Sequence, residues 1–262
     1  MASKKAQTTQ AQTVSASTPK TVLIGTPCLD GKLDAWYVNS LVDTIRVAMA
    51  NNVFIKPIFL AYESILPMAR NELFKVAFES NFDHLIFIDS DVAWDPLALM
   101  ELIHVDKPVV GLPYPLKSDN PGHYNISLGS PNEIVQDEKT GYIKVLNHGT
   151  GFLKIDKVVI EALWNSNVSL EFRDKQLKYI CEYQGQYSSF IGEDVVLCNK
   201  IRELGFEIWT NPKTTCMHIG NKIYTGNYQS YLDAIKQQTA ILKSNLLSGE
   251  NVTNNTIDLF DT

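Results

Sequence analysis

Two carboxylates follow an apolar run near the middle of the chain, where the sequence reads HLIFIDSDVAW over residues 84–94. The run has the composition of a buried strand, and Asp89 and Asp91 stand at its end, one residue apart. Side chains alternate along an extended chain, so both carboxylates would point the same way if the strand continued through them. Two convergent carboxylates suit a hard cation such as Mg²⁺ or Mn²⁺. The alternative is an Asx turn or a helix cap.

The segments around this run alternate between strand and helix. Strands are expected over residues 21–27, 53–62, 84–91 and 107–117. Helices are expected over residues 35–52, 68–80 and 95–105, the last capped by Asp95 with Pro96 at its first position. This alternation predicts an α/β fold, with a central mostly parallel, mixed β-sheet flanked by helices.

The pattern after residue 117 is less regular. Loops and antiparallel strands come first, and residues 165–186 read as a polar loop. Helices are then expected over residues 156–164, 192–205 and 231–247, and strands over residues 206–212 and 214–220. Gly205 would end the second of these helices.

Polar residues follow three of the expected strands. They are Thr26 and Pro27, then Asp89 and Asp91, then the segment from Tyr114 to Lys117. Ligands of open α/β sheets bind beyond the carboxyl ends of the strands, so these residues are candidates for one binding site.

The bulk composition excludes several classes of protein. The chain has 262 residues, 45% hydrophobic and 20% charged, which suits a globular protein with a sizeable core. A net charge of −6 argues against a nucleic-acid binder, which would carry a basic face. Residues 1–20 predict a disordered tail rather than a signal peptide. No apolar run reaches the roughly 18 residues of a membrane span. The 4 scattered cysteines favour a cytoplasmic protein.

Four segments together resemble the GT-A fold of glycosyltransferases that use nucleotide-sugar donors. They are HLIFIDSDVAWDP at 84–96, KPVVGLPYPLK at 107–117, GEDVVLCNKIRELGFEIW at 192–209 and CMHIGNKIY at 216–224. Their order and separation make the resemblance specific, and small viral and bacterial members look most similar. For a viral member the compartment would be the host cytoplasm. The resemblance implies a GT-A-like catalytic domain over residues 21–230, followed by a C-terminal helix and frayed tail over residues 231–262.

The resemblance also implies a role for each matching residue. Asp91 would bind a divalent metal, Mn²⁺ or Mg²⁺, that bridges the donor diphosphate, and His218 would complete the metal shell. Asp89 would bind the donor ribose, or the metal through water. The other donor-binding residues would be Thr26 and Pro27 at the nucleobase, Arg70 at the nucleotide or sugar, and Lys222 at the diphosphate.

Two of these residues keep a structural interpretation. For His218 the alternative is an ordinary structural histidine, satisfied by its surroundings, although the strand followed by GNK favours the metal ligand. Arg70 could equally be a solvated helix arginine paired with Glu72 or Glu79.

Catalysis needs a group that takes the proton of the acceptor hydroxyl. The resemblance implies Asp194 in this role, with Glu193 contacting acceptor or donor hydroxyls. The alternative is that both acids stabilise a helix N-terminus through its dipole. The loop Gly149, Thr150 and Gly151 would lie near donor and acceptor, because glycines allow the backbone to approach a ligand closely; a simple hairpin turn is the alternative.

The expected function is therefore transfer of a sugar from a UDP- or GDP-sugar to a glycan or other hydroxyl acceptor, with inversion. Three other functions are weighed. A phosphatase of the haloacid dehalogenase type would carry its motif on the first strand. A sugar nucleotidyltransferase usually opens with a basic, glycine-rich loop, of which IGTPCLDGK is a poor version. A non-catalytic carbohydrate- or nucleotide-binding module would not need Asp89, Asp91, Asp194 and His218, all of which are present.

Overall fold

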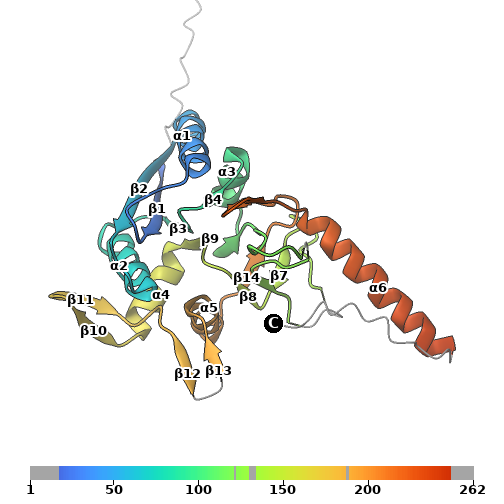
Figure 1. Ribbon diagram of the computed structural model, residues 1–262. Helices are drawn as coiled ribbons and strands as arrows, with labels where there is room; N and C mark the ends of the chain where they lie inside the picture. Colours follow the sequence, from blue (N-terminus) through green and yellow to red (C-terminus); the bar gives the residue numbers. More distant parts are fainter. Residues whose placement is uncertain (1–17, 121, 130–133, 187–188, 249–262) are drawn as a thin grey trace, which may run out of the picture.

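The computed structural model describes residues 18–120, 122–129, 134–186 and 189–248 (Figure 1). Most of the tail predicted over residues 1–20, and the frayed end beyond residue 248, lie outside the described residues. In the described part, no helix has the length and apolar character to cross a membrane.

A seven-stranded sheet forms the centre of the fold, in the order β2-β1-β3-β9-β5-β14-β7. β2, β1 and β3 are parallel neighbours, and β9 pairs antiparallel with both β3 and β5. β5 therefore runs in the direction of β3, as does its parallel neighbour β14, while β7 runs against β14. The predicted mixed, mostly parallel sheet is confirmed. Its strands are β1 (Lys20–Cys28), β2 (Val53–Ala61), β3 (His84–Ile88), β5 (Val109–Gly111), β7 (Ile143–Val145), β9 (Phe152–Asp156) and β14 (Ile208–Thr210).

Helices cover both faces of this sheet (Figure 1). They are α1 (Ala35–Ala50), α2 (Leu66–Glu79), α3 (Pro96–His104), α4 (Lys157–Ser166) and α5 (Glu193–Glu203). The start of α6 (Tyr228–Ser248) packs on the core through Tyr228 and Leu232, and the helix then extends away from the sheet (Figure 1). Alternate strand residues enter different apolar cores: Ile86 packs in the core with α1 and α3, and Leu85 and Phe87 pack in the core with α2, α4 and α5. Strand β3 is buried along its whole length, which explains why its sequence is continuously apolar.

Helix ends follow the predicted signals. The Asp95 side chain accepts a hydrogen bond of 2.9 Å from the N–H of Leu97, and Pro96 is the first residue of α3. Gly205 follows the end of α5 with a φ of +86°, a conformation that glycine adopts without strain.

Several strands differ from the sequence-based prediction. Residues 165–186 were expected to form a loop, but they contain β10 (Ser169–Phe172), β11 (Lys175–Lys178) and the start of a second hairpin, β12 (Gln184–Gln186) with β13 (Ser189–Ile191). The turn between β10 and β11 is Arg173-Asp174, both with positive φ, and these residue types give no strong turn signal. The strand expected over 107–117 is confined to β5, because Pro113 and Pro115 cannot donate ladder hydrogen bonds.

Smaller sheets lie beside the central one. β15 (Met217–Ile219) pairs antiparallel with β16 (Ile223–Tyr224) and with β4 (Val92–Ala93). β6 (Ile126–Ser127) pairs with β8 (Asn147–His148). The pairing of β15 with β4 brings two segments of the chain together that are far apart in sequence.

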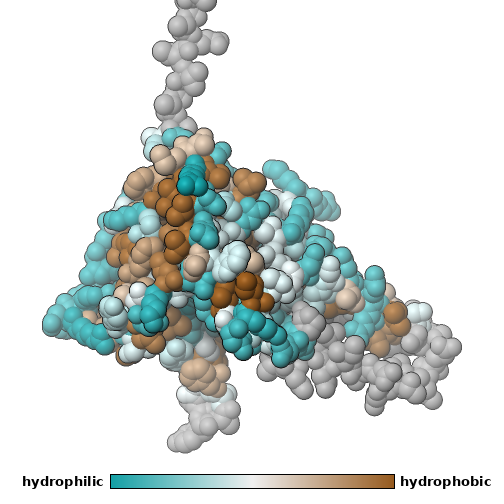
Figure 2. All heavy atoms as spheres, turned by 45° about the horizontal axis from the view of Figure 1, so that its top comes forward, coloured by the Kyte–Doolittle hydropathy of each residue, from teal (hydrophilic) through white to brown (hydrophobic). Residues whose placement is uncertain are grey.

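Apolar side chains reach the surface on α1 and on the edge strand β2. Figure 2 shows hydrophobic residues gathered in a band between hydrophilic ones on one face of the molecule. Phe54 and Phe59 of β2 are 55% and 42% exposed. The centre of β2 carries Lys56 and Pro57, and a charge and a missing N–H are the usual means by which edge strands avoid pairing with other chains.

Asp137 supports the loop that leads into β7. Its carboxylate accepts from Lys107 Nζ at 2.6 Å and from the N–H and hydroxyl of Thr140, both at 2.8 Å. These contacts, above all the one from Lys107, hold the pKa of Asp137 well below its usual range.

We expect Asp137→Asn to lower the melting temperature at pH 7. A carboxyl group whose pKa is lower in the folded protein than in the unfolded chain stabilises the fold at pH values above its unfolded pKa. The difference in melting temperature between the variant and the wild type should therefore shrink as pH falls below about 4. Thermal melts over this range measure it, and a difference independent of pH would contradict it.

Candidate active site at the strand ends

A cavity of about 300 Å³ lies at the carboxyl ends of β2, β1 and β3. We call it the strand-end cavity. Its lining comes from the end of β1 and the loop after it, the loop between β2 and α2, the turn after β3, and β15; the residues are Pro27, Leu29, Glu63, Ser64, Leu66, Asp89, Ser90, Asp91 and His218. Four of the residues singled out from the sequence are thus brought together: Pro27, Asp89, Asp91 and His218.

Asp89 and Asp91 do not continue the strand. β3 ends at Ile88, and the chain turns, with the N–H of Val92 donating to the Asp89 carbonyl at 3.1 Å. The alternation that would point both carboxylates the same way does not apply, and each carboxylate has its own partner. Asp89 is bound by Arg70, and Asp91 lies against Lys117 and His218.

His218 is placed beside Asp91 by the pairing of β15 with β4. His218 stands opposite Val92 in this pairing, and the N–H of Ile219 donates to the Asp91 carbonyl at 2.8 Å. The His218 Nδ1 lies 2.9 Å from the carbonyl oxygen of Pro115, which can only accept. Nδ1 therefore carries the proton, and in the neutral ring a lone pair remains on Nε2, 3.6 Å from Asp91 Oδ1. Metal-bound histidines use this arrangement.

Asp91 is ionised at neutral pH. Burial would raise its pKa, but the hydrogen bond and charge of Lys117, together with those of His218 when both ring nitrogens carry a proton, outweigh burial and hold the pKa below the ordinary value. Lys117 Nζ lies 2.5 Å from Asp91 Oδ2. A lysine thus neutralises this carboxylate, and a divalent cation would compete with the lysine for it.

The predicted metal set of Asp91, His218 and Asp89 is only partly assembled. Among the described residues, no group of three or more His, Cys, Asp or Glu side chains could hold a metal ion. Asp89 Oδ1 is occupied by Arg70. Asp91 and His218 remain as candidate ligands. Two neighbouring ligands of one octahedral ion lie about 3 Å apart, and His218 Nε2 lies 3.6 Å from Asp91 Oδ1. One carboxylate and one imidazole would give a divalent cation two protein ligands, with water and substrate phosphates completing its shell. The imidazole suits a transition-metal cation better than Mg²⁺, which prefers oxygen ligands.

Arg70 links two acidic residues that are far apart in the sequence. Its side chain is 2% exposed, and its guanidinium bonds Asp89 Oδ1 at 3.1 Å through Nη2 and Glu193 through Nη1. Burial lowers the pKa of Arg70, but the Asp89 and Glu193 carboxylates raise it by more, so the guanidinium stays charged. Arg70 is therefore not a solvated helix arginine. Glu72 and Glu79, its alternative partners, pair with lysines at positions 175 and 75.

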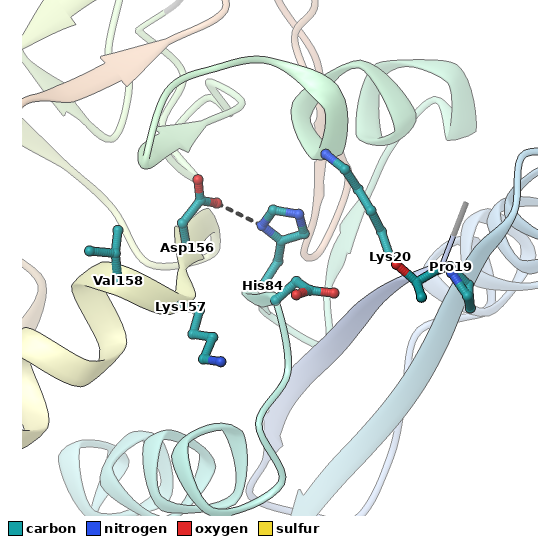
Figure 3. A pocket seen from close by; sticks show the side chains of 8 residues that line it. Pro19, Lys20, His84, Asp156, Lys157 and Val158 are labelled. Carbon is teal, nitrogen blue, oxygen red and sulfur yellow. Dashed lines mark hydrogen bonds and ion pairs between the residues drawn. The ribbon is translucent and has the colours of Figure 1, made fainter. Parts of the chain in front are cut away.

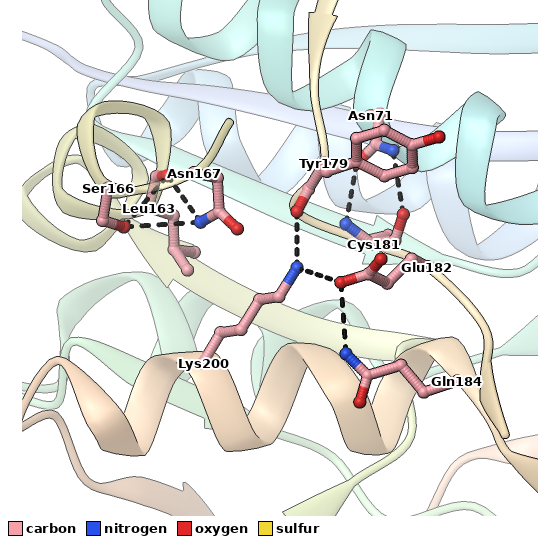
Figure 4. Close-up of polar contacts among 9 residues, drawn as sticks. All are labelled: Asn71, Leu163, Ser166, Asn167, Tyr179, Cys181, Glu182, Gln184 and Lys200. Carbon is pink, nitrogen blue, oxygen red and sulfur yellow. Dashed lines mark hydrogen bonds and ion pairs between the residues drawn. The ribbon is translucent and has the colours of Figure 1, made fainter. Parts of the chain in front are cut away.

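The segment before α5 is fixed to α2 beside Arg70 (Figure 4). The amide of Asn71 bonds both backbone groups of Cys181, at 2.9 and 2.8 Å. Lys200 on α5 reaches back to the carbonyl of Tyr179 at 2.5 Å and to Glu182 at 2.7 Å. These contacts hold residues 179–182 between α2, which carries Arg70, and the last turn of α5, the helix that carries Glu193.

The N-terminus of α2 opens into the strand-end cavity, since Ser64 and Leu66 line it. Its N-cap, Ile65, provides no side-chain bond, and the positive end of the helix dipole faces the cavity. Most of its N–H groups are engaged or missing, because Pro67 has none and the N–H of Met68 donates to the Ile65 carbonyl at 2.8 Å. Glu63 accepts from the N–H of Ile65 at 2.9 Å and from Arg173 at 2.7 Å. Sequence reasoning missed Glu63 and Ser64, although the end of β2 reaches the same sheet edge as β1 and β3.

The loop Gly149–Gly151 packs against the site's own side chains. The N–H of Gly151 donates to Tyr114 Oη at 3.0 Å, and a Cβ at Gly151 would lie 2.7 Å from Asp89 Oδ2. A Cβ at Gly149 would lie 2.6 Å from Tyr114 Oη, and Thr150 is buried. The glycines allow a close approach of backbone to Asp89 and Tyr114. Tyr114 also lies edge-on to the His218 ring, with centroids 5.3 Å apart.

Thr26, Lys222 and Asp194 lie outside the cavity lining, as do Arg70, Glu193 and the loop Gly149–Gly151. Thr26 is fully buried, with its hydroxyl 2.6 Å from Tyr37 Oη. Lys222 is exposed and pairs with Asp119. Asp194, in the first turn of α5, accepts from the N–H of Val195 at 2.8 Å, a contact that also fits the helix-dipole interpretation.

Tyr114 is buried among the charged groups of the site. Burial raises the pKa of Tyr114 well above its usual value, the charges of Asp89 and Asp194 raise it further, and the charge of Arg70 opposes them.

No family model matches the chain, and neither does any curated protein. Solved structures with a similar fold include A197 from STIV, with 17% identity and a TM-score of 0.49, covering 79% of this chain and 94% of that one. A UDP-glucose pyrophosphorylase complexed with UDP-glucose has 8% identity and a TM-score of 0.42, covering 86% and 99%. A glycosyltransferase involved in the glycosylation of the major capsid of PBCV-1 has 12% identity and a TM-score of 0.30, covering 56% and 66%. Likenesses this distant say nothing about the activity of this chain.

Proposed function

We propose that the chain is a metal-assisted glycosyltransferase, which moves a sugar from a UDP- or GDP-sugar to a glycan or another hydroxyl acceptor with inversion. The observation that carries the proposal is the Asp91–His218 pair at the strand-end cavity. It offers a carboxylate and an imidazole lone pair 3.6 Å apart, at the sheet edge where α/β folds bind ligands.

The donor would lie in the strand-end cavity. Its diphosphate would lie beside the N-terminus of α2, where the positive end of the helix dipole attracts anions. Lys117 pairs with Asp91 in this structure. When a cation binds the Asp91 carboxylate, the Lys117 ammonium would be released from it and would bind a phosphate oxygen of the donor instead. Glu63 also lines the cavity, with its two carboxylate oxygens held by the Ile65 N–H and by Arg173.

Asp91 and His218 would hold the cation, Mn²⁺ or Mg²⁺. A divalent cation at this position neutralises the charge that develops on a leaving nucleoside diphosphate. The chain itself fixes the ligands: Pro115 sets the His218 tautomer, and Ile219 binds the backbone of Asp91.

Asp194 is the stronger candidate for the base that accepts the acceptor's proton. Glu193 is engaged by Arg70, whereas Asp194 has no ion pair within the described ranges. Glu193 then acts as a positioning residue, because it fixes Arg70 and through Arg70 the carboxylate of Asp89.

The test is a thermal-shift screen with UDP, GDP and their sugars, with Mn²⁺, Mg²⁺ or EDTA. A ligand that binds the native state raises the melting temperature by mass action, so we expect a metal-dependent shift with one nucleotide class. Product analysis follows with that donor. Release of nucleoside diphosphate with a glycosylated acceptor supports the proposal. Pyrophosphate exchange would indicate a nucleotidyltransferase, and binding without turnover a non-catalytic module. No shift with any nucleotide contradicts the glycosyltransferase and the nucleotidyltransferase, and favours a carbohydrate-binding module.

A further inference from the structure

A second cavity, of about 350 Å³, lies at the amino ends of β1 and β3 (Figure 3). Polar side chains that line it bind other parts of the chain. His84 Nδ1 lies 2.7 Å from Asp156 Oδ1, which joins β3 to the end of β9, and Lys20 Nζ donates to the Ile103 carbonyl at 2.8 Å. These groups serve the fold, and the surface that best fits a further ligand lies elsewhere, on the hairpin before α5.

The hairpin of β12 and β13 presents two exposed aromatic rings on one face. Phe190 stands opposite Gly185 in the pairing of the two strands, and Tyr183 precedes Gly185 by two residues. Opposite and diagonal positions of an antiparallel pair share a face, and the ring centroids of Tyr183 and Phe190 lie 5.2 Å apart. Tyr183 is 46% exposed and Phe190 is 75% exposed. In the described part of the chain, no other contact between aromatic rings has both rings exposed.

The glycine opposite Phe190 keeps this face open. A Cβ at Gly185 would lie 2.6 Å from the carbonyl oxygen of Ser189 and 3.3 Å from Phe190 Cα, so a larger residue would clash there. No side chain can then stand across from Phe190, and one flank of its ring stays free for a ligand.

The strands of the hairpin carry no charged side chain. β12 has the sequence Gln-Gly-Gln, and β13 has the sequence Ser-Phe-Ile. The face of an aromatic ring carries partial negative charge and attracts the C–H groups of a sugar ring, while amides and hydroxyls pair with sugar hydroxyls. A lipid would favour a wholly apolar surface, and an anionic ligand would favour lysine or arginine. Aromatic rings among uncharged polar groups therefore indicate a neutral sugar.

Both ends of the hairpin are fixed beside the groups proposed for catalysis (Figure 4). Before it, the backbone of Cys181 is bonded to α2 at 2.9 and 2.8 Å. After it, β13 leads through one glycine into the first turn of α5, which carries Glu193 and Asp194. Burial raises the pKa of Tyr183, the charges of Glu193 and Asp194 raise it further, and the charge of Arg70 opposes them. The two rings thus project from a hairpin that is held beside the proposed base.

We propose that Tyr183 and Phe190 bind a sugar ring of the acceptor, which makes the acceptor a carbohydrate rather than another hydroxyl compound. The proposal rests on the glycosyltransferase function proposed above. Phe190, the more exposed ring, would stack on the sugar, and Tyr183 would pack at the edge of the stack. A hydroxyl of that sugar, or of the next one along the glycan, would then reach Asp194.

The first experiment measures binding of the methyl glycosides of glucose, galactose, mannose and N-acetylglucosamine to the full chain, by saturation-transfer NMR without donor. Phe190→Ala removes the ring, and Phe190→Tyr keeps it. Phe54→Ala is the matched control, since Phe54 lies on β2 and is 55% exposed. The second experiment measures transfer to the bound glycoside and to glycerol, a hydroxyl acceptor without a ring, using the donor found in the nucleotide screen.

We expect Phe190→Ala to raise the Kd and the KM of the glycoside about tenfold, the usual effect of losing one stacked ring. The KM of the donor and transfer to glycerol should stay unchanged, because neither involves the ring. Phe190→Tyr and Phe54→Ala should behave as the wild type does. The proposal is overturned if no glycoside binds in a way that depends on Phe190, or if Phe54→Ala weakens binding equally. It is also overturned if Phe190→Ala converts a dimer to a monomer in sedimentation velocity, which would make the face an interface between copies.

The two proposals can fail separately. A metal-dependent shift with nucleotide and hydrolysis of the donor, without glycoside binding at Phe190, would leave the transferase function standing and overturn the sugar site. Glycoside binding that depends on Phe190, without transfer to any acceptor, would contradict the transferase function and leave the sugar site in place.

Discussion

Replacing Arg70 by methionine is expected to lower the free energy of unfolding by about 3–5 kcal/mol, the usual cost of removing one partner from a buried ion pair. The guanidinium is the shared partner of Asp89 and Glu193, and Glu193 is 9% exposed. Methionine fills much of the volume but leaves the Glu193 carboxylate buried without its cation. Urea unfolding of the purified variant measures the loss.

Two controls separate the ion pair from loss of volume. Adding Glu193→Gln to Arg70→Met should recover part of the stability, because an amide is less costly to bury than a carboxylate. Arg46→Met is the matched surface change, because Arg46 pairs with Asp43 while 75% of its side chain is exposed, and it should leave stability unchanged. If Arg70→Met and Arg46→Met have the same free energy of unfolding, the buried ion pairs of Arg70 contribute nothing to stability.

Asp91→Asn is expected to reduce kcat/KM for sugar transfer by at least about 100-fold. A metal ion contributes several kcal/mol to stabilising a developing charge, and each 1.4 kcal/mol is tenfold in rate. The variant should also lose the metal-dependent thermal shift with the donor. Steady-state kinetics with the donor found by screening measures the first effect, and a melt with and without EDTA measures the second.

Asp91→Asn should not stabilise the fold. If Asp89 and Asp91 faced each other, the substitution would relieve their repulsion and stabilise the fold. Asp91 instead contacts Lys117 and His218, so the variant should have a slightly lower melting temperature than the wild type. Asp43→Asn, an exposed change of the same kind, is the control for activity and should behave as the wild type. Full activity of Asp91→Asn would exclude the role proposed for it.

The sequence was informative wherever a signal is local. A continuous apolar run predicted β3, an aspartate followed by a proline predicted the start of α3, and a glycine predicted the end of α5. The sheet edge that gathers Pro27, Asp89 and Asp91 followed from the alternation of strand and helix. These features depend on neighbouring residues and on general rules of parallel sheets.

The site's partners could not be predicted, because they come from distant segments. Arg70 and Glu193 are 123 positions apart, and no periodicity records their contact. The turn at Asp89 separates two carboxylates that a strand would have aligned. The hairpin of β10 and β11 was missed because its turn residues, Arg173 and Asp174, are not those that usually favour positive φ together.

Strand β9 has a consequence for the order in which the chain can fold. It joins β3 to β5 by antiparallel pairing on both sides, although both of those strands precede it by more than 40 residues. A nascent chain that ends before residue 152 therefore carries two unsatisfied strand edges at the middle of its sheet. Such edges favour aggregation, and pairing across long separations slows folding. The first half of this chain is thus expected to depend on the second for its solubility during synthesis, and the two should not be separable as fragments.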